Sequence, residues 1–242
     1  MSKGALVKTV RFKEGSYVGD PVNVVRIFNQ KEVDELILLD IHANTQDCGI
    51  DYETLKKVAS ECFMPICYGG GVRSIEDMRR LYALGIEKVS LSAAAFEIPG
   101  LVQSASREFG AQAVVVTLDY KKGLLGRNTV RTHNGTRDTG STPLDAALEF
   151  EKQGVGEILL NSIDRDGTWS GLDLKLIQEV SQSVTVPVIA MGGAGSIQHI
   201  KDAVKEAGAS AVAIGSMALF QDKDLGVLIK FPSRKDQDEL FI

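Results

Sequence analysis

Two glycine-rich segments of the sequence have the residue types of phosphate-binding loops. Gly69-Gly70-Gly71 and Gly192-Gly193-Ala194-Gly195 each follow a short apolar run and precede a helical pattern. Glycine lets backbone N–H groups approach an anion closely, and the dipole of the following helix favours negative charge at its N-terminus. Either cluster alone would fit an ordinary turn equally well, because glycine readily adopts positive φ angles.

The two clusters belong to a repeat with a period of half the chain. Residues 65–75 recur in similar form as residues 187–197, which lie 122 positions later in a chain of 242 residues. Further along each half, Ser92-Ala93 and Gly215-Ser216 could complete two equivalent cradles. The repeat therefore favours a ligand with a phosphate at each end, or a symmetric ancestor that bound a phosphate in either half.

Acidic side chains stand where three of the apolar runs end. They are Asp40, Asp119 and the closely spaced Asp164 and Asp166. Asp119 is the candidate general acid or base, because burial can move the pKa of a carboxyl group toward neutrality. The alternative is a salt bridge. The repeat aligns Arg11 with Asp119, and an arginine opposite this carboxylate would keep it ionised.

Charged residues also stand where three apolar runs begin, namely Glu35, Lys88 and Glu157. Each one alone fits a solvated position at the start of a strand. Taken together, opposite charges on three alternate strands could form a ring around one end of a barrel.

These residues need a scaffold that brings the ends of many strands together. Short runs rich in Val, Ile and Leu alternate with segments of helical period, and such alternation indicates parallel strands joined by helices. The expected strands are residues 6–12, 35–40, 64–68, 88–92, 113–119, 157–163, 187–191 and 211–215. Eight units with an internal repeat predict one (β/α)8 TIM barrel over residues 1–242, with half-barrels of about 1–110 and 111–242.

The position of a residue along its strand then indicates its role. Sites in such barrels lie at the C-terminal ends of the strands, which is where the glycine clusters and Asp119 fall. Glu35, Lys88 and Glu157 fall at the opposite face. The glycine- and arginine-rich segment 121–140 follows the fifth run and is a candidate mobile flap over the mouth.

Composition excludes several classes of function. A net charge of −5 provides no basic surface for nucleic acid, and no apolar stretch has the roughly 20 residues that a membrane span needs. We therefore expect a soluble cytoplasmic protein without a metal or other cofactor. Its cysteines, Cys48, Cys62 and Cys67, should be reduced thiols. Its histidines, His42, His133 and His199, do not have the sequence spacing of metal ligands.

Asp119, residues 162–168 and residues 192–195 closely resemble the HisF family, the cyclase subunit of imidazole glycerol phosphate synthase. The resemblance implies a (β/α)8 barrel that receives ammonia from a HisH-like glutaminase on its N-terminal face and uses it on a bisphosphorylated substrate. It makes Asp119 one of two catalytic aspartates and aligns the other with Arg11. It also implies two phosphate sites, formed by Gly71, Ser92, Ala93, Asp166, Gly167, Gly193, Gly215 and Ser216.

The same resemblance assigns Glu35, Lys88 and Glu157 to an ammonia gate, with Ala5 at the place of a fourth charged residue. An arginine cannot act as the base that an aspartate provides, so we expect impaired cyclisation. The leading hypothesis is a HisF-like subunit that relays ammonia for sugar amidation in polysaccharide biosynthesis, with a separate sugar amidotransferase as a further partner. The alternatives are an authentic cyclase of histidine biosynthesis and a non-catalytic activator of the glutaminase.

Overall fold

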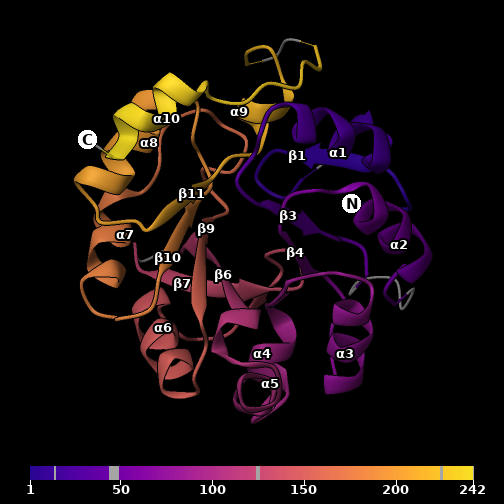
Figure 1. Cartoon of the computed structure of the whole chain (residues 1–242). Helices are drawn as coiled ribbons and strands as arrows, with labels where there is room; N and C mark the ends of the chain where they lie inside the picture. The colour runs from indigo at the N-terminus through magenta and orange to yellow at the C-terminus, as the bar shows by residue number, and fades with distance from the viewer. Residues whose placement is uncertain (14, 44–48, 124–125, 224–225, 242) are drawn as a thin grey trace.

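A computed structural model describes residues 1–13, 15–43, 49–123, 126–223 and 226–241. Seven parallel strands form a sheet in the order β11, β10, β9, β6, β5, β4, β3, which curls as in an α/β barrel (Figure 1). The predicted fold class is therefore confirmed. The strands are β3 (Leu36–Leu39), β4 (Ile66–Gly69), β5 (Lys88–Leu91), β6 (Val114–Lys122), β9 (Glu157–Ser162), β10 (Val188–Met191) and β11 (Ala211–Ala213).

Helices surround the sheet on its outer side (Figure 1). Several begin at a side chain that accepts a backbone N–H, as Ser74 Oγ does from Asp77 at 3.1 Å. Among the described residues, none of the helices has the length and apolar character needed to cross a membrane. The helices are α1 (Pro21–Gln30), α2 (Tyr52–Glu61), α3 (Ile75–Ala83), α4 (Ala93–Glu97), α5 (Leu101–Phe109), η1 (Ala111–Ala113), α6 (Pro143–Lys152), α7 (Leu174–Ser181), α8 (Ile197–Lys205), α9 (Ser216–Leu219) and α10 (Arg234–Phe241).

Alternate residues of each strand point to opposite faces of the sheet, and this separates two apolar clusters. Val116, Leu118 and Ile158 belong to the larger cluster, which packs between the sheet and the helices. Val115 and Leu159 belong to a smaller cluster inside the barrel, together with Cys67 and Ile189. Residues at odd positions of β6 and β9 therefore face the interior, and Asp119 is one of them.

Among the predicted strands, the first one differs in the structure. The run at 6–12 was expected to be a barrel strand, but β1 (Leu6–Thr9) pairs antiparallel with β2 (Gly15–Gly19). Arg11 and Phe12 have φ angles of 54° and 58°, which turn the chain back before the run can continue. Within the described part of the chain, β3 and β11 are the two ends of the parallel sheet and no strand bridges them. Residues of the β1–β2 hairpin, including Val7 and Lys8, line the barrel interior beside these two strands.

The segment after β6, predicted to be a flap, is built as an antiparallel extension of the sheet. β6 pairs with β7 (Asn128–Thr132), which pairs with β8 (Arg137–Asp138). Its three arginines take part in ion pairs: Arg127 with Asp145 at 3.8 Å, Arg131 with Asp138 at 2.9 Å and Arg137 with Glu97 at 2.8 Å. The segment thus has regular backbone hydrogen bonds, and its proposed motion stays a prediction.

The sequence repeat is also visible in backbone angles. The N-cap residues of α2 and α7, Asp51 and Asp173, have φ/ψ angles of −81°/77° and −84°/76°. Ser92 and Gly215 precede α4 and α9 with the uncommon pairs −120°/−91° and −112°/−84°. Equivalent positions of the two halves therefore adopt the same local conformations, including the two positions expected to complete the phosphate cradles.

The cysteines also occupy defined positions. Cys62 is half-buried and Cys67 is buried, and both are free thiols. Burial raises the pKa of Cys67 well above its usual range, so this thiol is unreactive at neutral pH. Cys48 lies outside the described residues.

Candidate active site

A cavity of about 890 Å³ extends through the barrel interior. It reaches from Glu35, at the N-terminal ends of the strands, to Asp119 and Asp166 at the C-terminal ends. Among the predicted phosphate-site residues, its lining includes Gly71, Ser92, Ala93 and Gly215 together with Asp166. The other predicted site residues are not part of this lining: Arg11, Lys88, Glu157, Gly167, Gly193 and Ser216.

Asp119 has the properties of a proton-transfer group. It points into the barrel from β6, and Asn161 on β9 donates a hydrogen bond from Nδ2 to its Oδ1 at 2.7 Å. Burial raises the pKa of Asp119 to about 7; the hydrogen bond from Asn161 opposes this, the charge of Asp166 adds to it, and Ser92 opposes it. A carboxyl group that is half ionised near neutral pH can both accept and donate a proton.

Arg11 does not face Asp119, which corrects the expected opposition of these two residues. Its side chain is exposed and lies outside the cavity lining. Its backbone N–H donates to the carbonyl oxygen of Asp166 at 2.9 Å, which fixes the turn after β1 against the loop after β9. Because the first run forms a hairpin, alignment of β1 with β6 does not predict which side chain faces Asp119.

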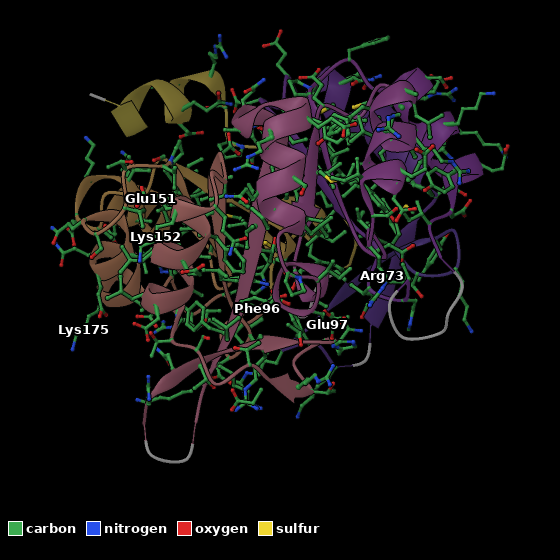
Figure 2. All side chains as sticks on the ribbon, turned by 90° about the horizontal axis from the view of Figure 1, so that it is seen from below. Arg73, Phe96, Glu97, Glu151, Lys152 and Lys175 are labelled. Atoms are coloured by element: carbon green, nitrogen blue, oxygen red, sulfur yellow. The ribbon has the colours of Figure 1, made fainter. Side chains whose placement is uncertain are left out.

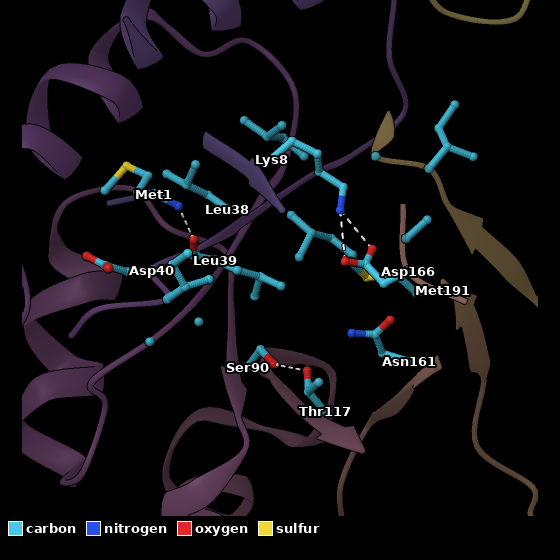
Figure 3. Close-up of a pocket in the computed structure, with 18 of the residues that line it drawn as sticks. Met1, Lys8, Leu38, Leu39, Asp40, Ser90, Thr117, Asn161, Asp166 and Met191 are labelled. Carbon is cyan, nitrogen blue, oxygen red and sulfur yellow. Dashed lines mark hydrogen bonds and ion pairs between the residues drawn. The ribbon is translucent and has the colours of Figure 1, made fainter. Parts of the chain in front are cut away.

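Lys8, which no sequence motif singled out, supplies a cation at the mouth. Its Nζ donates to both carboxylate oxygens of Asp166, at 2.8 and 2.9 Å (Figure 3). The two side chains are 13% and 5% exposed. A Cβ added to Gly215 would lie 2.9 Å from Lys8 Cε, so this lysine also borders the second predicted cradle. In the sequence, the feature that could have marked Lys8 as a site residue is its charge within an apolar run.

The glycines of both clusters allow close approach of neighbouring loops. Gly70 has a φ of 126°, and an added Cβ would lie 2.4 Å from the carbonyl oxygen of Asp40. Gly193 has a φ of 111°, and an added Cβ would lie 2.2 Å from the carbonyl oxygen of Gly171. These contacts by themselves require glycine, so the packing explanation holds for both clusters whether or not they also bind phosphate.

Replacing Gly193 by alanine is therefore expected to destabilise the fold. The positive φ and the contact with Gly171 together should lower the free energy of unfolding by about 2 kcal/mol or more. Gly140 is the matched control, because its φ is 77° but no atom lies within 4 Å of an added Cβ. Urea denaturation of the two variants should show a clearly larger loss for Gly193→Ala. Equal losses would show that backbone angle alone determines the effect.

The turn between β7 and β8 lies over the mouth of the barrel. His133 and Asn134 line the cavity, and Asn134 Nδ2 donates to the carbonyl oxygen of Ile41 at 2.7 Å. Glu97, at the end of α4, accepts from Arg137 and also contacts Arg73 at 3.4 Å (Figure 2). These contacts connect the turn to the loops that follow β3 and β4 and to the end of α4, near the first predicted cradle.

The three charged residues at the opposite end form a connected cluster. Lys88 Nζ donates to Glu35 Oε2 and to Glu157 Oε1, both at 2.8 Å. Burial of Lys88 lowers its pKa, but its bonds to Glu157 and Glu35 outweigh burial and raise the pKa overall. The expectation that Glu35, Lys88 and Glu157 are separate solvated charges is therefore wrong. Whether this cluster gates ammonia stays a prediction.

Between this cluster and Asp119 the interior changes from apolar to polar. Above the small apolar cluster of Cys67 and Leu159, Ser90 and Thr117 share a hydrogen bond of 2.6 Å (Figure 3). Asn161 follows at the level of Asp119, and both hydroxyl residues are buried. The interior therefore offers a small polar molecule hydrogen-bonding groups on the way to the mouth.

Comparison with known proteins identifies the family. Residues 1–224 match the family described as "Histidine biosynthesis protein". The chain is 51% identical over 227 residues to "Putative imidazole glycerol phosphate synthase subunit hisF2" of Pseudomonas aeruginosa, covering 94% of this chain and 90% of the relative. It is 42% identical over 215 residues to "Imidazole glycerol phosphate synthase subunit HisF" of Alkaliphilus metalliredigens, covering 89% and 85%. The chain thus belongs to the HisF family of histidine biosynthesis proteins.

Proposed function

We propose that this protein is the ammonia-receiving subunit of a cytoplasmic glutamine amidotransferase. A HisH-like glutaminase would dock on the N-terminal face, and ammonia would pass through the barrel for amidation of a sugar in polysaccharide biosynthesis. A separate sugar amidotransferase would then use the ammonia. The observation that best supports this proposal is the Lys88 cluster with Glu35 and Glu157, which stands at the end of the interior opposite Asp119.

The carboxylates at the mouth favour relay over cyclisation. Among the described residues that line the cavity near Asp119, Asp166 is bound to Lys8, and Asp40 accepts the backbone N–H groups of His42 and Ala43. Burial raises the pKa of Asp119 to about 7. A reaction that needs two carboxyl groups for proton transfer would therefore be slow, whereas transfer of a proton to or from ammonia needs one.

Reconstitution with a HisH-like glutaminase from the same organism tests the proposal. We expect a stable complex, glutamine hydrolysis that depends on the barrel, and little imidazole glycerol phosphate from the histidine-pathway substrate. Loss of one positioned proton-transfer group typically lowers a rate by ~10²- to 10⁴-fold. A cyclase from the histidine pathway, assayed in parallel with the same substrate and ammonium salt, is the reference for this comparison.

Two outcomes would favour the other functions. Turnover close to that of the reference enzyme would contradict the relay and identify an authentic cyclase, which the names of the relatives also suggest. The two glycine-rich cradles would then hold the phosphates of the substrate. Stimulation of the glutaminase without transfer of ammonia to any acceptor would identify a non-catalytic activator. Failure to form a complex would contradict both the relay and the activator.

A further inference from the structure

Asn161 and Asp119 are paired residues of neighbouring strands. The parallel register of β6 and β9 places Asp119 opposite Asn161, with both side chains directed into the barrel. Asn161 is 1% exposed, and its Nδ2 lies 2.7 Å from Asp119 Oδ1. In this orientation the amide donates, which suits an ionised carboxylate because a carboxylate only accepts hydrogen bonds.

The other end of the same amide is unsatisfied. Asn161 Oδ1 is buried and has no hydrogen-bond partner within the described part of the chain. A Cβ at Gly192 would lie 2.9 Å from this oxygen and 2.6 Å from the carbonyl oxygen of Ser162. The backbone nitrogen of Ser162 also lies 2.9 Å from this Cβ, so the Ser162 backbone is near the unsatisfied end of the amide. A buried acceptor without a partner is unfavourable, whereas an N–H group in its place could donate to the nearby Ser162 carbonyl oxygen.

Protonation of Asp119 gives its carboxyl group an O–H donor. When the proton lies on Oδ1, this oxygen donates and needs an acceptor where the amide now presents Nδ2. Rotation of the Asn161 amide by about 180° exchanges its oxygen and nitrogen, which have nearly the same size. The rotated amide would accept from Asp119 and present its NH₂ group beside the carbonyl oxygen of Ser162.

We infer that Asn161 is a positioning residue whose side-chain amide rotates when Asp119 exchanges a proton. The inference rests on the role of Asp119 in the proposed function. The charged group that acts on Asp119 is Asp166, from the loop after β9, and Asp166 is itself bound to Lys8. From α4 and the β7–β8 turn, Ser92 and His133 line the same cavity. Asn161 is bonded directly to Asp119 and can serve both of its protonation states.

Nuclear magnetic resonance of the full chain tests this coupling without a partner protein. We follow the Asp119 carboxyl carbon and the Asn161 side-chain amide signals from pH 5 to 9. Both are expected to change with a common midpoint near 7. In Asp119→Asn the Asn161 signals should no longer titrate with that midpoint. Asn128 on β7 is the matched control, because it lies outside the lining of this cavity. Asn161 signals that stay constant through the Asp119 titration would overturn the rotation.

Two substitutions test the positioning role. Asn161→Leu removes the charge-assisted bond to ionised Asp119, so the proton affinity of Asp119 should rise by about tenfold. Asn161→Thr keeps a hydroxyl that can donate and accept, and it should restore much of the original midpoint. An unchanged midpoint in a folded Asn161→Leu protein would overturn the role. A glutaminase complex that forms while the amide shows no titration would reject this inference alone, whereas a coupled titration without any complex would reject the proposed function alone.

Discussion

Replacing Lys8 by methionine is expected to lower the free energy of unfolding by about 3 kcal/mol at pH 7 to 8. Lys8 contacts both oxygens of Asp166, and the two side chains are only 13% and 5% exposed. Methionine preserves the apolar stem of the side chain but leaves the carboxylate of Asp166 buried without a cation. The loss should be measured by urea denaturation, and it should diminish as the pH falls, because protonation removes the uncompensated charge.

The double variant Lys8→Met/Asp166→Asn separates charge from packing. It removes the charge together with its partner, so most of the lost stability should return. Lys13 is exposed on the same hairpin, and Lys13→Met should change the free energy of unfolding by less than about 0.5 kcal/mol. If the double variant is as unstable as Lys8→Met alone, the contribution of Lys8 comes from packing rather than from the ion pair.

The importance of Lys8 also shows where sequence patterns were sufficient and where they were not. The predicted runs from residue 35 onward correspond to parallel strands, because their apolar residues are buried by helices on one face and by the interior on the other. The run at 6–12 has the same composition, but period-two alternation does not specify the partner of a strand. Left-handed backbone angles at Arg11 and Phe12 decided the outcome, and composition did not reveal them.

The candidate site was predicted unevenly for a similar reason. Asp119 and the charged residues Glu35, Lys88 and Glu157 stand at the ends of runs, where a polar side chain is conspicuous in the sequence. Lys8 and Asn161 stand within or at the end of apolar runs whose burial dominates the pattern. Their partners, Asp166 and Asp119, come from other strands or loops. Spacing along one strand cannot predict such a pair, whereas the register between strands does.

The substitution Asp119→Asn is expected to remove most of the pH dependence of stability that this site produces. The pKa of Asp119 is about 7 in the folded protein, and an unfolded aspartate has a pKa of about 3.9. Below about pH 4 both states are protonated. Between about pH 4 and 7 the unfolded state releases this proton and the folded state retains it, so stability falls as the pH rises, by at most about 1.4 kcal/mol per pH unit.

The introduced amide does not titrate, and its oxygen can still accept from Asn161. The stability of wild type relative to Asp119→Asn should therefore fall from pH 4 to 7 and then level off, as measured by urea denaturation across this range. Asp34→Asn, at an exposed position before β3, should leave the wild-type slope unchanged. Parallel stability curves for wild type and Asp119→Asn would mean that Asp119 is ionised throughout the range. Such a carboxylate could hold a cation such as ammonium, but it could not donate a proton at neutral pH, which would exclude its role as a general acid.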